Sequence, residues 1–243
     1  MSFPNFSDPQ WFYETSRPIV IGCYIVAFVL AVIGIYMGFF VTPIDYRQCN
    51  SYRIIFIHIP CAWMSLFTYL MMAFYTIWAL VTKSKMAPVF AVAMAPTGAI
   101  MGFIALFTGS MWGRPTWGTY WVWDARLTSM LILFFLYLGY IALHTAFDDW
   151  RKADRAAAVI AIVGALNVPI IYFSVRWWNT LHQGASITTH GTSMETTMFY
   201  TVLTMVAAMW IYCTGAIVRR ARTVVLERYR REPWARAAAA KEA

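Results

Sequence analysis

The sequence predicts an all-α, polytopic integral membrane protein that folds as a bundle of six transmembrane helices. Of the 243 residues, 60% are hydrophobic and only 12% are charged, whereas roughly a quarter of the residues of soluble domains are charged. Several apolar runs reach about 20 residues, the length that crosses a hydrocarbon core about 30 Å thick. The chain is long enough for one such bundle and too short for a further large soluble domain. We therefore expect residues 1–243 to form a single membrane domain.

Polar segments separate the apolar runs and define the predicted spans in order. The spans are residues 18–41, 54–81, 88–109, 127–147, 156–177 and 195–218, and a basic tail of residues 219–243 follows the last. The first run, from Ile19 to Val41, is longer than the core of a signal peptide and has no small-residue cleavage site after it, so we expect a retained span. The segments "PTGAIMG" around Gly98 and "LNVPI" around Pro169 indicate close helix packing, where small and kinking residues are common in membranes.

The placement of lysine and arginine predicts the orientation of the bundle, because cytoplasmic loops carry an excess of these residues. An even number of spans puts both termini on one side, and that side holds 14 of the 19 Lys and Arg residues. Eight of these lie in the tail of residues 219–243, directly after the last span. We therefore expect cytoplasmic termini, with loops 42–53, 110–126 and 178–194 on the outer, periplasm-like face. We interpret the tail as a solvated or lipid-surface basic helix and not as a nucleic-acid-binding segment.

The four cysteines are scattered along the chain. They form no C-x-x-C or C-x-x-C-H spacing, so neither a metal–thiolate site nor a covalently attached c-type haem is expected. Cys49 and Cys61 are expected near the same membrane face. Nothing in the sequence fixes the geometry that a disulfide between them requires, so we do not predict one.

The loop of residues 110–126 is unusually aromatic. The stretch "WGRPTWGTYWVWDARLT", from Trp112 to Thr128, has four tryptophans within its first twelve residues. One or two tryptophans at a membrane interface are ordinary, but four suit a large, flat, apolar ligand, because each aromatic pair adds about 0.5–1.5 kcal/mol beyond area burial. The glycines and proline of the stretch indicate a shaped turn, and Trp117 and Trp121 share a face only if their segment is helical. A lipid-facing aromatic belt remains the alternative.

Asp124 and Arg126, near the end of this loop, each have two interpretations. Asp124 stands just before the apolar run from Leu127, so it could cap that helix, and Arg126 could simply mark the membrane interface. Alternatively, Asp124 orients a group of a loop and Arg126 meets the carboxylate of a ligand. The local sequence favours neither interpretation.

Two histidines share the outer face with the tryptophan loop. His58, in "FIHIPCAW", lies in the first turns of the second span, where an ionisable side chain is by default a functional candidate. His182, in "WNTLHQGAS", lies in the last outer loop. Two imidazoles beside a flat aromatic surface indicate haem, whose iron takes axial histidine.

Three arginines and two further histidines are the other charged or ionisable candidates. Arg53, Arg126 and Arg176 are on the outer side and are candidates to balance haem propionates. His144 falls near the cytoplasmic end of the fourth span, and His190 falls near the end of the last outer loop.

Three segments together resemble the cytochrome c maturation protein C family. The stretch "WGRPTWGTYWVWDARLT" resembles the tryptophan-rich WWD motif of haem-handling proteins, and "FIHIPCAWMS" and "WWNTLHQG" are similar to the family's flanking histidine segments. The similarity covers essentially the whole chain, with six spans, the motif in the second outer loop and a histidine on each side of it.

The resemblance implies a non-covalently held haem b at the outer leaflet of a bacterial inner membrane. It implies His58 and His182 as the axial ligands of the iron, and a platform for the macrocycle. The platform residues are Trp112, Trp117, Trp121, Trp123 and Asp124, with Arg126 beside them. His190 is a competing ligand, but His182 is preferred because it lies within the matching segment.

The resemblance also implies partners. The protein would present haem to a membrane-anchored periplasmic chaperone, cytochrome c maturation protein E, which bonds it through a histidine of its own. An ABC-type ATPase complex of maturation proteins A and B, with the small adaptor protein D, would then release the loaded chaperone. This chain has no G-x-x-x-x-G-K and no Gly-Lys pair, so it lacks a phosphate-binding loop. We therefore expect a binding and hand-over module, not an enzyme, with ATP hydrolysis supplied by a partner.

Two other classes of protein remain open on the sequence. A b-type cytochrome or quinone oxidoreductase subunit usually carries paired histidines deep in its spans, whereas here only His58 and His144 fall within spans, near opposite ends. A purely structural transporter subunit would use the tryptophans as a lipid belt, and its histidines would be incidental.

Overall fold

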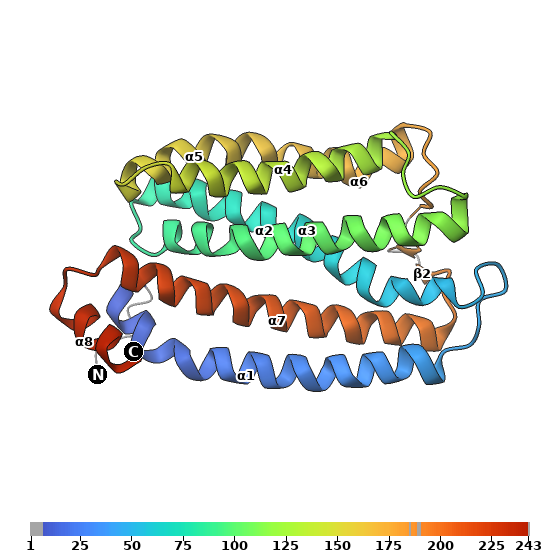
Figure 1. Ribbon diagram of the computed structural model, residues 1–243, viewed down its shortest axis with the longest axis horizontal. Helices are drawn as coiled ribbons and strands as arrows, with labels where there is room; N and C mark the ends of the chain where they lie inside the picture. Colours follow the sequence, from blue (N-terminus) through green and yellow to red (C-terminus); the bar gives the residue numbers. More distant parts are fainter. Residues whose placement is uncertain (1–6, 185, 189–190, 243) are drawn as a thin grey trace.

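The computed structural model describes residues 7–184, 186–188 and 191–242, and its backbone is dominated by long helices that run side by side (Figure 1). The helices are α1 (Pro9–Tyr36), α2 (Ile55–Thr82), α3 (Ala87–Trp117), α4 (Ala125–Thr145), α5 (Trp150–Ala165), α6 (Asn167–Trp177), α7 (Thr196–Arg228) and α8 (Pro233–Glu242). A π-helical turn (Met37–Val41) extends α1, and a 3-10 turn (Ser51–Ile54) leads into α2. Two short strands, β1 (Ile187–Thr188) and β2 (Gly191–Thr192), pair antiparallel.

Six helical segments are long and apolar enough to cross a membrane. They are Pro9–Val41, Ser51–Thr82, Ala87–Trp117, Ala125–Thr145, Trp150–Trp177 and Thr196–Arg228. The predicted all-α, polytopic membrane protein is thereby confirmed. The fifth segment is divided into α5 and α6 at Leu166, next to Asn167 and Pro169, because proline has no N–H to continue the helical hydrogen bonding.

Several helices extend beyond the predicted spans, and α1 and α5 begin at Pro9 and Trp150 instead of at residues 18 and 156. α3 continues to Trp117 and α7 to Arg228, beyond the predicted ends at residues 109 and 218. Hydropathy marks the part of a helix that crosses hydrocarbon, but backbone hydrogen bonding continues into the interfacial layer, where arginine, leucine and glutamate are good helix formers. The loop predicted at residues 110–126 therefore shrinks to 118–124.

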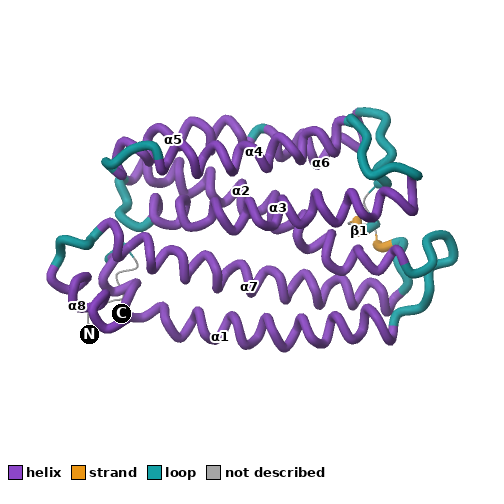
Figure 2. Tube along the Cα trace, in the orientation of Figure 1, coloured by secondary structure: helices purple, strands orange, loops and turns teal. Residues whose placement is uncertain are grey.

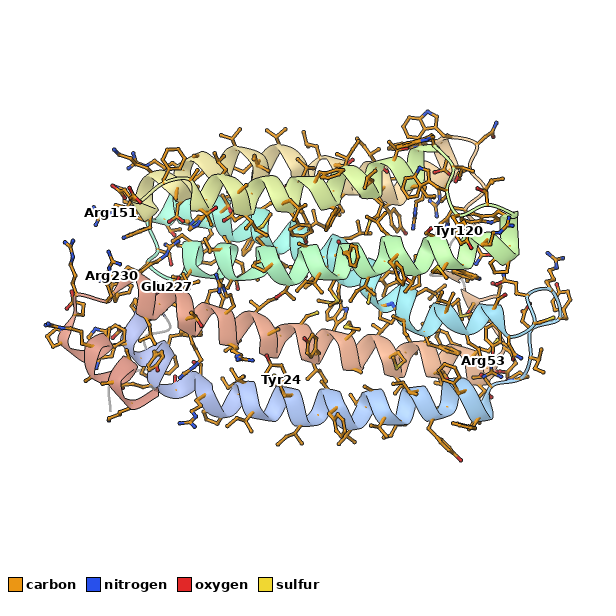
Figure 3. All side chains as sticks on the ribbon, in the orientation of Figure 1. Tyr24, Arg53, Tyr120, Arg151, Glu227 and Arg230 are labelled. Carbon is orange, nitrogen blue, oxygen red and sulfur yellow. The ribbon has the colours of Figure 1, made fainter. Side chains whose placement is uncertain are left out.

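The connections between spans lie alternately at two opposite ends of the bundle (Figure 1, Figure 2). Both chain termini and the α2–α3 and α4–α5 connections lie at one end, which we call the terminus end. Residues 42–50, 118–124 and 178–184 lie at the other, which we call the loop end. Arg151 is at the terminus end and Tyr120 is at the loop end (Figure 3). The two termini thus share an end, as an even number of spans requires.

Glycines allow the helices to approach closely, as is usual in membrane bundles. A Cβ atom at Gly98 of α3 would overlap the ring of Tyr137 of α4, and one at Gly164 of α5 would overlap the hydroxyl group of Tyr69 of α2. Both tyrosines are fully buried. Their hydroxyl groups donate hydrogen bonds to main-chain carbonyls of neighbouring helices, at 2.7 Å for Tyr137 and 2.8 Å for Tyr69. The glycines and tyrosines together hold α2, α3, α4 and α5 in one core.

α1 is the peripheral helix of the bundle. It packs along α7 and makes few contacts with the other spans (Figure 1). Gly34 of α1 lies against Met205 of α7. On its other side, large apolar side chains such as Ile25, Phe28 and Val32 are exposed. In a membrane that side contacts lipid.

An ion pair joins three helices at the terminus end. Asp154 of α5 accepts two hydrogen bonds from the guanidinium group of Arg228 of α7, at 2.9 and 2.6 Å. Asp154 also lies 3.0 Å from Nε2 of His144 of α4, and the guanidinium group of Arg228 lies 4.8 Å from the ring centroid of Trp150. The basic tail was predicted to be solvated or to lie on the lipid surface. The side chain of Arg228 in this tail is instead buried against the protein, because it pairs with the partly buried carboxylate of Asp154.

The cysteines are free thiols. Cys49 is exposed and Cys61 is buried, so the two form no disulfide, in agreement with the sequence analysis.

Candidate functional site

A cavity opens at the loop end, between α2, α3, α4, α6 and the adjoining loops. The space between its walls is about 760 Å³, which includes space that is open to solvent. Of the eight residues predicted to form a site, six line it. They are His58, Trp112, Trp117, Trp121, Arg126 and His182. Much of the remaining wall is small or apolar, with Ala62, Leu66 and Ala105 as examples.

The tryptophan stretch is partly helix and partly loop. Trp112 and Trp117 belong to the last turns of α3, which also contain the glycine and proline that predicted a turn. The helix ends at Gly118, whose φ of 81° is left-handed, a backbone conformation that glycine adopts without steric cost. Trp121 lies in the following loop, so it does not pair with Trp117 on one helical face. The two rings reach the same cavity from different elements instead.

His58 is fixed against α3 by a hydrogen bond. Its Nδ1 lies 3.1 Å from Oγ1 of Thr108, and that hydroxyl group donates its own proton to the carbonyl of Ile104 at 2.6 Å. With the hydroxyl proton of Thr108 on the carbonyl of Ile104, its oxygen accepts from Nδ1–H of His58, and this tautomer leaves the lone pair on Nε2. The ring of Trp112 packs edge-on against His58 at 5.7 Å, and the indole N–H of Trp112 donates to Oε1 of Gln48 at 2.7 Å.

His182 has the same tautomer, but its Nδ1 donates to a main-chain carbonyl. Its Nδ1 lies 2.7 Å from the main-chain oxygen of Gln183. A carbonyl only accepts, so the proton is on Nδ1 and the lone pair is again on Nε2. Burial lowers the pKa of His182 to about 4, and the positive charge of Arg126 adds to the effect. His182 is therefore a neutral imidazole at pH 7, with its ring centroid 6.2 Å from that of Trp117.

Trp123 and Asp124 do not line the cavity. Trp123 is 77% exposed and packs edge-on against Trp121 at 5.6 Å. Oδ1 of Asp124 accepts the N–H of Leu127 at 2.8 Å and so caps α4, while Oδ2 accepts the hydroxyl proton of Thr180. Both interpretations of Asp124 from the sequence, a helix cap and a contact with a loop group, are therefore present at once.

The indole N–H of Trp121 differs from that of Trp112. It is buried and has no hydrogen-bond partner among the residues that the structure describes. Leaving such a donor unpaired costs free energy, so a buried unpaired group in a cavity wall calls for an explanation.

The three candidate arginines differ in their surroundings. Arg126 lines the cavity and donates from Nη1 to the carbonyl of Ile171 at 3.0 Å. Arg53 does not line it. Its guanidinium group donates to the main-chain carbonyls of Gly38 and Thr42 at the π-helical turn. Arg176 is also absent from the wall, so Arg126 is the one of the three that lines the cavity.

The other two histidines do not add to the cavity. His144 is bound to Asp154 at the terminus end, far along the bundle from the first turns of α2. His190 lies outside the described residues.

Sequence reasoning missed the residues that support the histidines. Thr108 and Gln48 contact His58 and Trp112 across 50 and 64 residues of chain. Thr180 bonds to His182 two residues further on and to Asp124, which is 56 residues away. No periodicity or motif in the sequence signals such contacts.

Comparison with known proteins places this architecture in a family. The family model described as Heme exporter protein C matches residues 2–236. The heme exporter protein C of Escherichia coli is 46% identical over 210 residues, which cover 86% of this chain and 85% of that protein. That of Bradyrhizobium diazoefficiens is 43% identical over 229 residues, 94% of this chain and 87% of that protein.

A more distant relative comes from an organelle. A ccmC-like mitochondrial protein of Marchantia polymorpha, named for cytochrome c biosynthesis, is 43% identical over 201 residues, 82% of this chain and 85% of that protein. The family model and the relatives all cover most of the length of the six-span bundle. The chain belongs to the heme exporter protein C family.

Proposed function

We propose that this protein binds haem in the cavity at the loop end and hands it to a partner during the biogenesis of c-type cytochromes. One observation carries the proposal. His58 and His182 line the same cavity, and the Nδ1 atom of each lies within hydrogen-bond distance of an oxygen, which leaves Nε2 for a metal. Histidines that ligate metals usually donate their other N–H to an oxygen in this way, and haem iron takes axial histidine.

The rest of the cavity suits the macrocycle and its charges. Trp112, Trp117 and Trp121 supply flat apolar surface on the wall. The unpaired indole N–H of Trp121 and the guanidinium group of Arg126 are donors that a propionate would accept from. On this proposal the haem is a b-type haem, held non-covalently. Trp123 and Asp124 do not line the cavity and act through their neighbours.

The membrane setting of the proposal follows from charge. The loop end faces the periplasm and the basic terminus end faces the cytoplasm of a bacterial inner membrane, in line with the excess of Lys and Arg at the terminus end. Presenting haem at the periplasmic face would place it where a periplasmic chaperone, maturation protein E, receives it. The names of the relatives, heme exporter and cytochrome c biosynthesis protein, support this assignment.

On this proposal, partner proteins hydrolyse ATP and release the haem-loaded chaperone. The chain has no phosphate-binding loop, so the ATPase and permease subunits A and B, with adaptor D, would hydrolyse ATP and release the loaded chaperone. The chain itself binds and positions, and it is not an enzyme. The oxidoreductase alternative is disfavoured because His144, the second histidine within a span, is bound to Asp154 at the opposite end.

A haem titration of the purified protein in detergent tests the proposal. We expect a six-coordinate, low-spin visible spectrum at a stoichiometry of one, and its loss when apo-chaperone is added and takes up the haem. Absence of any haem spectrum would support a structural transporter subunit instead. A bound haem that undergoes quinone-coupled redox turnover would support the oxidoreductase.

Replacing Gly109 by alanine is expected to weaken haem binding roughly 10- to 100-fold, the usual cost of disturbing the support of a metal ligand. A Cβ atom at Gly109 would lie 2.9 Å from Cε1 and 3.4 Å from Nδ1 of His58, so it would push the imidazole away from Thr108. The dissociation constant from the titration measures the effect. Gly22→Ala is the matched control, because nothing lies within 4 Å of a Cβ atom there. Equal affinities of the two variants would contradict this role of Gly109.

Haem ligation by His182 is expected to be insensitive to pH from about 8 down to about 5. The folded pKa of about 4 lies below the ordinary value of 6.5, so the side chain stays neutral over this window and takes up a proton only near pH 4. With an ordinary pKa, the neutral fraction would fall about tenfold per pH unit below roughly 6.5. The six-coordinate fraction, followed spectrally against pH, distinguishes the two. A midpoint near 6.5 in the wild-type protein would contradict the prediction.

A further inference from the structure

Asp124 belongs to the aromatic motif but does not line the cavity. One carboxylate oxygen accepts the N–H of Leu127 at 2.8 Å, and the other accepts the hydroxyl proton of Thr180. Both oxygens are thus used within the protein, and Asp124 is not on the cavity wall. Its effect on a ligand must therefore pass through another residue.

Thr180 is the residue through which Asp124 reaches the cavity. Its hydroxyl group donates to Asp124, and the same oxygen accepts the main-chain N–H of His182 at 3.0 Å. A hydroxyl group has one proton and two lone pairs, so this pattern is electrostatically consistent. The first bond has a charged acceptor, which makes it stronger than a neutral one.

The segment that carries His182 depends on such contacts. α6 ends at Trp177, and residues 178–184 belong to no helix or strand. Without a backbone ladder, a loop is positioned by its side-chain and capping contacts. His58, in contrast, is positioned by the helical backbone of α2. The two imidazoles therefore have unequal support.

We propose that Thr180 is a positioning residue that fastens the His182 loop to the start of α4 through Asp124. The Asp124–Thr180–His182 chain sets where the imidazole of His182 stands relative to that of His58. Asp124 is thereby a support for a ligand and not part of the surface that meets the macrocycle. The haem-binding part of this inference rests on the proposed function. The hydrogen bonds of Thr180 to Asp124 and His182 are present without any ligand.

The variant Thr180→Val tests the inference, because valine has a similar shape and removes both hydrogen bonds while the cap of α4 stays intact. Thr180→Ser keeps the hydroxyl group and serves as the rescue variant. Thr192→Val is the matched control, since Thr192 lies in the same inter-helix segment and its hydroxyl group bonds to Ser186 at 3.1 Å, with no bond to Asp124 or to His182. Each full-length variant is purified in detergent as the apoprotein.

Two readouts are taken on each variant. The first is hydrogen–deuterium exchange of the amides of residues 178–184 in the apoprotein, expected to be roughly tenfold faster in Thr180→Val because the N–H of His182 has lost its acceptor. The second is a haem titration followed by visible spectroscopy. There we expect roughly 10- to 100-fold weaker binding, a five-coordinate fraction, and recovery of the six-coordinate spectrum when imidazole is added. Thr180→Ser and Thr192→Val should match the wild type in both.

The outcomes separate this inference from the proposed function. Faster exchange together with imidazole-reversible loss of six-coordination supports the positioning role. Wild-type exchange and a wild-type spectrum in Thr180→Val overturn it. If the wild-type protein binds no haem, the proposed function fails. The exchange readout then decides alone, since faster exchange supports the fastening of the loop by Thr180 and unchanged exchange overturns it.

Discussion

Replacing either His58 or His182 by alanine is expected to abolish the six-coordinate haem spectrum. Each substitution removes one of the two imidazoles that line the cavity, and the loss of a ligand should cost at least the roughly 10- to 100-fold that follows from disturbing its hydrogen-bond partner. The measurement is the visible spectrum and the dissociation constant of the purified variants. Because the two histidines are supplied by different elements, α2 and the loop after α6, the single variants should leave different five-coordinate species.

Two histidine controls make the assignment specific. His144→Ala removes an imidazole at the terminus end, where it contacts Asp154, and should keep the wild-type haem spectrum. His190→Ala tests the competing ligand from the same outer loop and should also keep it. If both His58→Ala and His182→Ala retain the wild-type spectrum and load the chaperone, the ligand assignment is wrong. If His190→Ala loses the spectrum and His182→Ala does not, the second ligand is His190.

Replacing Gly98 by alanine is expected to destabilise the bundle strongly. The added Cβ atom would overlap the ring of Tyr137, which is fully buried and bonded through its hydroxyl group to the carbonyl of Ser65 at 2.7 Å. The ring cannot retreat without losing that bond. Overpacking of this kind costs about 1–3 kcal/mol and occasionally more, and the loss of the buried hydrogen bond adds to it.

The free energy of unfolding in mixed detergent micelles measures this effect. Gly22→Ala is again the control, because a Cβ atom there meets nothing within 4 Å, and it should leave the unfolding free energy unchanged. Equal stability of Gly98→Ala and Gly22→Ala would show that α3 and α4 can separate at this crossing without cost. That result would contradict the close packing that the small residues of α3 indicate.

The sequence predicted the spans well because crossing a membrane imposes a simple rule on length and composition. It did not predict where the helices end, because the requirement for apolar residues applies only within the hydrocarbon core of the bilayer. Trp112 and Trp117 were assigned to a loop, yet they lie in the last turns of α3. Glycine and proline near a helix end resemble a turn in the sequence, and only the backbone decides between the two.

The sequence predicted six of the side chains that line the candidate site. It did not predict the residues that hold those side chains in place. Imidazole and indole side chains are rare enough on one face of a membrane protein to stand out, so His58, His182 and the tryptophans could be selected by residue type and side. The direction of a side chain is not encoded in that way. Trp123 is largely exposed and does not line the cavity, although it is two residues from Trp121. Thr108 fixes the tautomer of His58 from 50 residues away, which no local pattern reveals.

The peripheral position of α1 has a consequence for how the chain is made. α1 packs almost only along α7, yet α1 begins at Pro9 and α7 begins at Thr196. A ribosome adds about 5–20 residues per second, so the nascent first helix spends roughly 8–30 s in the bilayer before its neighbour has been synthesised. α1 is the most apolar of the six spans. That composition makes it stable in the lipid bilayer without a packing partner until α7 has been synthesised.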